Sequence, residues 1–219
     1  MQAQPEYKIR VFYSVTNRAR FLSHKEIIRF LTRAIRRAGF PIKYSQGFHP
    51  RVLLSFGPSR SVGLASTSEI FDMRLSEDCE PQKIQTELQK CFPENIKIEY
   101  VQKISEKQAA ISAINSADYE CEFPEILEDM PEKIKTVFQK KELLVNRSKE
   151  KITKIVNIRP GILEIKSNAN LVKLCLGLTP ELTVKPQEVL KELTGWSDDK
   201  LREICTTRTA LNPCSKNRE

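Results

Sequence analysis

Residues 23–41 read SHKEIIRFLTRAIRRAGFP and contain the strongest structural signal in this 219-residue chain. Ser23 and Glu26 have the spacing of a capping box, in which each side chain satisfies a backbone amide at the start of a helix. Apolar residues then recur at helical spacing on one face: Ile27, Leu31, Ala34, Ile35 and Ala38. Gly39 and Pro41 end the pattern. The sequence therefore predicts an amphipathic helix over residues 24–38.

The opposite face of this helix is predicted to be cationic. Five basic residues follow one another at spacings of mostly three and four: Lys25, Arg29, Arg33, Arg36 and Arg37. Guanidinium groups pair bidentately with phosphates, which favours an anion-binding stripe. Arg36 and Arg37 also complement the negative end of the helix. A solvated face without a ligand is therefore the alternative interpretation.

Outward from the helix, alternating apolar and polar residues predict strands at 7–13, 52–56, 68–75 and 96–101. A second helix begins at Pro81, with Ile84, Leu88 and Cys91 on its inner face. The resulting order, β-α-β-β-α-β, is the ferredoxin-like plan.

The second half shows a similar pattern without sequence identity to the first. We expect strands at 117–123, 143–145, 162–165, 171–176 and 201–206, with helices at 131–138 and 186–193. Residues 146–160 are polar and basic, and form either a long loop or an extra hairpin. The expected fold is α+β, with two tandem ferredoxin-like halves and antiparallel sheets. Residues 1–110 form the basic N-terminal domain, 111–211 the C-terminal domain and 212–219 a flexible tail.

Charge is distributed unevenly along the chain. The net charge is +8, yet residues 1–60 alone carry 12 Lys/Arg against two acids, Glu6 and Glu26, for a net charge of +10. This asymmetry indicates a nucleic acid, a phosphorylated ligand or an acidic partner surface. A cationic surface that binds nothing remains the alternative.

The loop at 44–51 reads YSQGFHPR and combines aromatic, amide and cationic side chains. Aromatic rings beside cations suit base stacking near a phosphate, and a glycine lets a ligand approach the backbone. The candidate binding residues here are Tyr44, Gln46, Gly47, Phe48, His49 and Arg51. Alternatively, Tyr44 and Phe48 anchor the loop to the core.

A second loop, SFGPSRS at 55–61, places small residues after a strand. Such residues leave backbone amides available to an anion, and Arg60 would reinforce the site. A plain hairpin turn at Gly57-Pro58 explains the same residues.

The two histidines, His24 and His49, would share a site if the loop folded back over the start of the helix. A histidine general base beside a cation cleaves RNA without a metal. A structural role for His24 within the capping segment is the simpler interpretation.

No cofactor or metal is expected. Two histidines are too few ligands, the six cysteines match no zinc or iron–sulfur spacing, and the phosphate-binding loops GxxxxGK[ST] and GxGxxG are absent. Because no apolar run approaches about 20 residues and the N-terminus has no signal core, we expect a cytoplasmic protein with no membrane association.

Four segments resemble motifs of the radical-SAM-linked protein family: RFLSH (20–24), RAIRRAGFP (33–41), YSQGFHP (44–50) and LSFGP (54–58). The resemblance extends to RTAL (208–211). This bacterial family of unknown function is fused to, or encoded beside, radical SAM proteins, which implies a helper that presents or recruits a substrate such as RNA. Asparagine often replaces His49 in the family, which argues against proton transfer there. The chain lacks C-x-x-x-C-x-x-C and so is not the radical SAM catalyst.

These observations predict a non-catalytic RNA-binding or substrate-presenting accessory protein that works with a radical SAM partner. One alternative is a metal-independent endoribonuclease of the CRISPR repeat-processing type, suggested by fold-level similarity, although residues 195–219 lack the usual glycine-rich loop. The other is a protein-interaction adaptor without nucleic acid.

Overall fold

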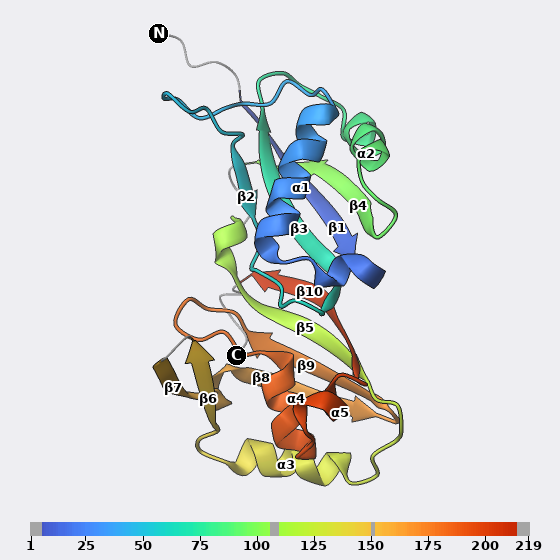
Figure 1. The fold of residues 1–219 in the computed structure, drawn as a ribbon, viewed down its shortest axis with the longest axis vertical. Coiled ribbons are helices and arrows are strands. Elements are labelled where there is room, and N and C mark those ends of the chain that lie inside the picture. The colour runs from blue at the N-terminus through green and yellow to red at the C-terminus, as the bar shows by residue number, and fades with distance from the viewer. Residues whose placement is uncertain (1–5, 106–109, 150–151, 214–219) are drawn as a thin grey trace. The chain divides into compact units, whose positions relative to one another are not determined.

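The computed structural model describes residues 6–105, 110–149 and 152–213. Internal contacts divide the chain into two compact units, Met1–Ile114 and Asn115–Glu219 (Figure 1). Helices and antiparallel strands occur in both units, which confirms the α+β class. No helix among the described residues is long and apolar enough to cross a membrane.

The first unit follows the predicted order of strands and helices. Its elements are β1 (Tyr7–Val15), η1 (Asn17–Phe21), α1 (His24–Arg37), β2 (Leu54–Phe56), β3 (Ala65–Leu75), α2 (Pro81–Lys90), β4 (Ile96–Lys103) and η2 (Ile111–Ala113). The strands lie in the order β4-β1-β3-β2, and each neighbouring pair is antiparallel. The strand predicted at 52–56 is shorter than expected, because Val52 forms only an isolated bridge with Tyr44.

The core of the first unit lies between this sheet and the helices α1 and α2 (Figure 1). Alternate residues of β1 point into it, and Ile9 and Val11 are fully buried. Leu31 of α1 and Leu88 of α2 are also fully buried, so both helices turn their apolar faces to the sheet. Burial of this apolar surface is the main force that holds α1 in place.

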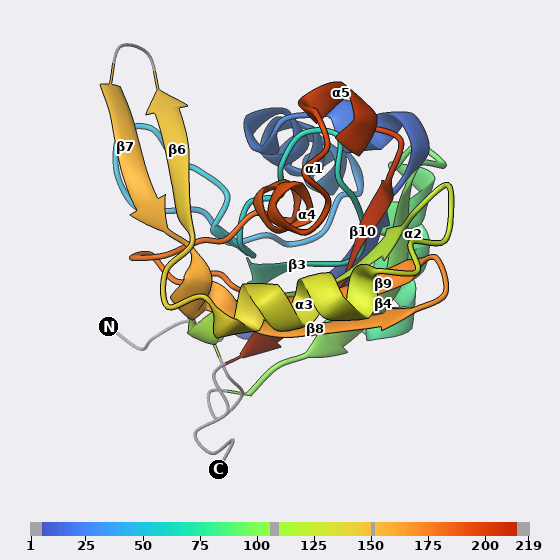
Figure 2. The ribbon, with the colours of Figure 1, turned by 90° about the horizontal axis from the view of Figure 1, so that it is seen from below.

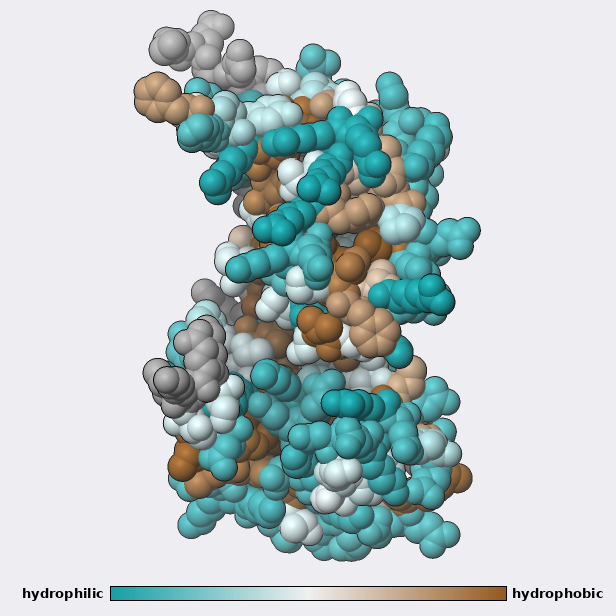
Figure 3. Space-filling view, viewed as in Figure 1, coloured by the Kyte–Doolittle hydropathy of each residue, from teal (hydrophilic) through white to brown (hydrophobic). Residues whose placement is uncertain are grey.

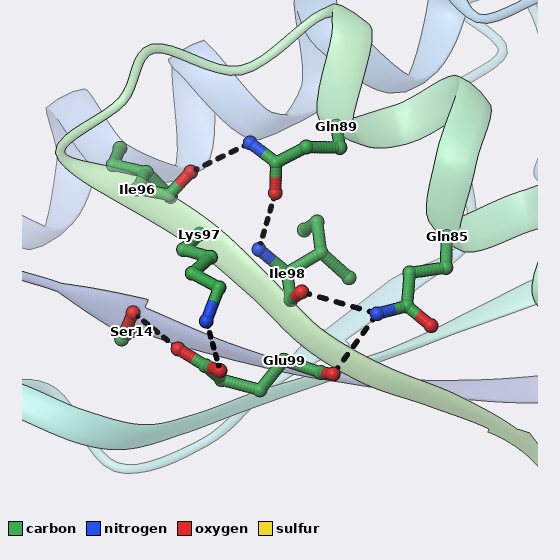
Figure 4. Close-up of polar contacts among 7 residues, drawn as sticks. All are labelled: Ser14, Gln85, Gln89, Ile96, Lys97, Ile98 and Glu99. Atoms are coloured by element: carbon green, nitrogen blue, oxygen red, sulfur yellow. Dashed lines mark hydrogen bonds and ion pairs between the residues drawn. The ribbon is translucent and has the colours of Figure 1, made fainter.

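Strand β4 is an edge strand of the sheet. Side-chain amides of α2 cover part of the free edge of β4 (Figure 4). The backbone N–H of Ile98 donates to Gln89 Oε1 at 2.7 Å, and Gln89 Nε2 donates to the Ile96 carbonyl at 3.5 Å. Gln85 Nε2 donates to the carbonyls of Ile98 and Glu99 at 3.3 and 2.9 Å. The two glutamines thus form hydrogen bonds that an additional strand would otherwise form.

The second unit contains β5 (Ile114–Glu122), α3 (Met130–Gln139), β6 (Leu144–Lys149), β7 (Ile152–Asn157), η3 (Arg159–Gly161), β8 (Ile162–Asn168), β9 (Leu171–Gly177), α4 (Pro186–Thr194), α5 (Asp198–Leu201) and β10 (Cys205–Pro213). The strands β10-β5-β9-β8 lie side by side in that order. The helix α4 ends at Gly195, whose φ of 69° is left-handed, as the sequence predicts.

The region that the sequence left open between a loop and a hairpin is a hairpin. Strands β6 and β7 pair as a separate two-stranded sheet, and Figure 2 shows them standing away from β8 and β9. Arg147 fixes this hairpin to α4 through a bidentate pair with Glu188 at 2.8 and 2.7 Å. The strand predicted at 143–145 therefore extends to Lys149.

The last predicted strand, at 201–206, was placed too early. Ser197 caps α5 by accepting a hydrogen bond from the Lys200 amide, and this helix takes the chain to Leu201. Strand β10 consequently begins at Cys205 and runs to Pro213. The tail predicted from 212 therefore begins within a strand, and residues 214–219 lie outside the described residues.

Candidate anion-binding surface

The helix α1 forms as the sequence predicts, over His24–Arg37. Ser23 Oγ accepts a hydrogen bond from the Glu26 amide at 3.3 Å, and the Ser23 amide donates to Glu26 Oε2 at 2.8 Å. Both halves of the capping box are therefore present. The helix ends before Gly39, whose φ of 73° is left-handed and would strain any other residue.

The basic stripe, defined as Lys25, Arg29, Arg33, Arg36 and Arg37, is exposed along its whole length. It spans about 18 Å of helix, at 1.5 Å per residue. In Figure 3 hydrophilic side chains cover most of the surface over α1. Within the part of the chain that the structure describes, none of the five side chains forms an ion pair. Their positive charge therefore remains available to a ligand.

Two members of the stripe have a second contact. Arg37 donates to the Cys91 carbonyl at 3.1 Å, which satisfies an acceptor at the end of α2. The Arg36 guanidinium lies 6.0 Å from the centre of the Tyr44 ring, within cation–π range. This contact brings the end of α1 together with the loop that contains the aromatic candidates.

Residues 42–53 form an arm between α1 and β2, which Figure 1 shows reaching beyond the sheet. Its two sides are joined near the base, where Leu53 N donates to the Lys43 carbonyl at 3.0 Å and Tyr44 bridges Val52. Farther out, Ser45 N donates to the Arg51 carbonyl at 2.8 Å. The remaining candidates lie on the outer part of the arm and are exposed: Gln46, Gly47, Phe48, His49 and Arg51.

Arg60, which the sequence placed in an anion site, is not on this surface. Its side chain is buried, with the residue 9% exposed, and donates to the carbonyls of Arg20, Leu22, Ser61 and Leu64. Burial of a guanidinium is tolerated here because these carbonyls satisfy its donors. Arg60 therefore holds the loop before β3 in shape. The Gly57 amide in the same segment also has a partner, the Ile70 carbonyl at 3.0 Å.

The two histidines are not brought together. His24 begins α1, is half-buried, and its ring meets the Phe56 ring edge-on at 6.3 Å. It lines a cavity of about 10 Å³ together with Tyr13, Arg60 and Glu69, which is too small for a substrate. His49 lies on the exposed arm, which is braced at the other end of α1 by Arg36 and Tyr44.

The two ends of α1 are about 18 Å apart by helix rise, so the single site that the sequence predicted for His24 and His49 is not formed. Across the described ranges, no group of three or more His, Cys, Asp or Glu could hold a metal ion.

The sequence missed an apolar feature at the start of α1. Phe21 and Val62 are 58% and 59% exposed. Gly63 lies next to the Phe21 ring, since a Cβ atom at position 63 would be 3.9 Å from it. The Arg20 guanidinium stacks 4.9 Å from the Phe21 ring centre. Exposed rings beside cations thus occur near both ends of α1. Phe21 lies between the strand predicted at 7–13 and the helix predicted from residue 24, where no apolar periodicity marked it.

Residues 8–191 match the family described as "Uncharacterized protein conserved in bacteria (DUF2344)". The chain belongs to this family. The matched residues include all of α1 and the whole arm, so the candidate surface is part of the DUF2344 region. No curated protein matches the chain. The description of DUF2344 names no activity and no radical SAM protein, and that association stays a prediction.

Proposed function

We propose that this DUF2344 protein is a non-catalytic RNA-binding or substrate-presenting accessory protein, and that the basic stripe of α1 is its main contact with RNA. The observation that carries this proposal is the set of five exposed cations on one helix face, with no carboxylate paired to them among the described residues. A polyanion would gain favourable contacts along the whole stripe and release its counterions.

The electrostatics of the rest of the unit support this assignment. Cations on its sheet have acidic partners, such as Arg74 with Glu6 at 2.9 Å and Lys103 with Asp78 at 2.7 Å. These pairs cancel much of each other's field at a distance. The stripe differs from these pairs because its five exposed cations form no ion pair among the described residues of this unit.

A radical SAM protein is proposed as the partner only because of the resemblance in sequence. No feature of the histidines favours the endoribonuclease, since His24 and His49 lie at opposite ends of α1. We also propose that both units are ferredoxin-like domains, divided near residue 110. The strand orders β4-β1-β3-β2 and β10-β5-β9-β8 support this assignment.

The test is binding of a fluorescently labelled, mixed-sequence 20-nucleotide RNA to the full chain, followed by anisotropy at increasing NaCl. If each of the five cations neutralises one phosphate, the plot of log affinity against log salt has a slope of about −3.5. The double variant Arg33→Glu/Arg36→Glu should bind at least about tenfold more weakly at low salt and show a shallower slope.

The matched control is Lys135→Glu/Lys141→Glu, which makes the same change in net charge at two exposed lysines of the second unit. It should bind almost as well as the wild type. Absence of binding at low salt, or equal losses in the two double variants, would refute the proposal. Circular dichroism confirms that each variant is folded.

A further inference from the structure

We infer that the surface selects single-stranded RNA, and that Phe48, at the end of the arm, stacks on an unpaired base of it. This inference rests on the proposed function, because the phosphates are bound by the basic stripe. It adds the class of nucleic acid and the side chain that distinguishes it.

The first observation is that hydrogen bonds hold the arm that carries Phe48 in one conformation. Hydrogen bonds join the arm to β3, where Lys43 N donates to the Arg74 carbonyl at 2.8 Å. Farther out, the Ser45 and Arg51 amides close the loop, the second by donating to Ser45 Oγ at 3.0 Å. Gly47, with a φ of 124°, makes the turn that a residue with a side chain would adopt only under strain. A ligand would therefore lose less free energy in ordering this loop than in ordering a free one.

The second observation is that the two aromatic residues of the arm differ. Tyr44 lies beside Arg36 and is 43% exposed, so part of its ring is already covered. Phe48 is 102% exposed and, among the residues that the structure describes, it has no ring or cation contact. Tyr44 therefore braces the arm against α1, whereas both faces of the Phe48 ring are open to a ligand.

The third observation is the chemical setting of that ring. His49 and Arg51 lie beside Phe48 on the arm and are exposed, and the stripe begins where Arg36 meets Tyr44. Among the described residues of the arm, Lys43 forms an ion pair with Glu6 at 3.6 Å, close to the base of the arm. If Phe48 instead inserted into an apolar pocket of a protein partner, cations around its ring would not be required. A nucleotide requires both a flat apolar surface for its base and positive charge for its phosphate.

A single strand fits these groups better than a duplex. In a duplex the bases are paired and stacked, so an inserted ring must first separate a base step. The major groove of A-form RNA is also too deep and narrow for side chains to read. Unpaired bases are free to stack on an aromatic ring, and stacking of this kind tolerates any base.

The test compares one 20-nucleotide RNA as a single strand and annealed to its complement, with the full chain as the binding protein. Phe48→Ala should weaken binding of the single strand about tenfold and leave both duplex binding and the salt slope unchanged. Phe48→Trp should restore single-strand binding, and its indole fluorescence should be quenched when a base stacks on it. Ile155→Ala, which truncates another exposed apolar residue in the second unit, is the control.

The outcomes distinguish a failure of this inference from a failure of the proposed RNA-binding function. If the wild type binds RNA but Phe48→Ala binds the single strand equally well, the inference is wrong and the proposed function stands. Equal affinity for single strand and duplex also overturns it. If no variant binds RNA at any salt, the proposed function itself fails. If Phe48→Ala instead abolishes capture of a purified protein partner without affecting RNA, the arm is a protein-docking element. Because Phe48 is 102% exposed, its truncation should not unfold the protein, and loss of fold would not explain any of these results.

Discussion

The cations of α1 and the cations of the sheet beneath it belong to the same unit but have different surroundings. On the sheet, Arg10 holds Asp72 at 2.8 and 2.9 Å, and hydrogen bonding to Asp72 raises the pKa of Arg10 above its usual value. Lys97 pairs with Glu99 at 3.1 Å (Figure 4). On α1 no such pair exists among the described residues. A charge count along the sequence treats these two groups of cations alike. In the described part of the structure the sheet cations form ion pairs, whereas the stripe forms none and has one nearby carboxylate, Glu26, which interacts electrostatically with Arg29.

This difference separates two uses of a basic side chain. A cation with a bound carboxylate stabilises the fold and contributes little field at a distance. A row of like charges with no ion pair weakens the helix that carries it. The helix dipole offsets this repulsion only at Arg36 and Arg37, in the last turn. Four substitutions test this division, in order of decreasing effect.

The largest effect is expected for Arg60→Met. This change leaves the carbonyls that Arg60 binds without a donor inside the loop, and we expect the free energy of unfolding to fall by about 3 kcal/mol. Urea denaturation followed by circular dichroism measures it. Arg51→Met, at an exposed position, should change stability by no more than about 0.5 kcal/mol. If the two variants are equally stable, water replaces the guanidinium and Arg60 is not structural.

A smaller loss is expected for Asp72→Ala. The pair with Arg10 is partly buried, with side-chain exposures of 11% for Arg10 and 19% for Asp72. Removing the carboxylate should lower the free energy of unfolding by about 1–2 kcal/mol. Asp78→Ala removes a partner of Lys103 in a more exposed pair, with side-chain exposures of 40% for Lys103 and 52% for Asp78, and should cost less than about 0.5 kcal/mol. A thermal or urea scan in which Asp78→Ala is the worse variant would contradict the assignment.

Glu26, the one acidic residue in the α1 sequence, gives a pH-dependent effect. The Ser23 hydroxyl, and then the Ser23 amide, lower the pKa of the Glu26 carboxyl below its ordinary value of 4.5. A lowered carboxyl pKa stabilises the fold above the ordinary value, and this stability is lost as the pH falls through the lowered value. The difference in urea midpoint between the wild type and Glu26→Gln should therefore shrink on acidification below about pH 4.5. A difference that is unchanged by pH would show that the carboxylate charge plays no part in the cap.

The smallest effect, and the only gain, is expected for Arg33→Gln. Arg29 and Arg37 each lie one helical turn from Arg33, and like charges at this spacing repel by about 0.2–0.5 kcal/mol per pair. The variant should be more stable by about 0.5 kcal/mol at low salt, and the gain should vanish in about 1 M NaCl, where the Debye length is about 3 Å. Loss of stability at low salt would show that Arg33 has a structural role on α1.

The sequence was informative where local signals agreed. The capping box, the apolar spacing and Gly39 all predicted the same helix, and the structure has it at His24–Arg37. The first unit was predicted in the right order because alternation is clear in β1, β3 and β4. The second unit was harder to predict, since the pairing that fixes the β6–β7 hairpin depends on Arg147 reaching Glu188, 41 residues away.

The same limit applies to the candidate site. The stripe was predictable because helical spacing alone sets which residues share a face. The burial of Arg60 was not, because its acceptors come from residues 20 and 22 as well as from its own loop. The different surroundings of Tyr44 and Phe48 likewise depend on where Arg36 lies in space. Spacing specifies faces of elements, whereas the partner of a long side chain is specified by the tertiary fold.

The amides of Gln85 and Gln89 on the edge of β4 have a consequence for the protein at high concentration. A bare edge is a template on which a second chain can form intermolecular β-structure. Here two side chains already satisfy the donor and the acceptors of Ile96, Ile98 and Glu99. A crowded solution, or assembly of many copies along one polyanion, therefore brings copies together without offering that segment for aggregation.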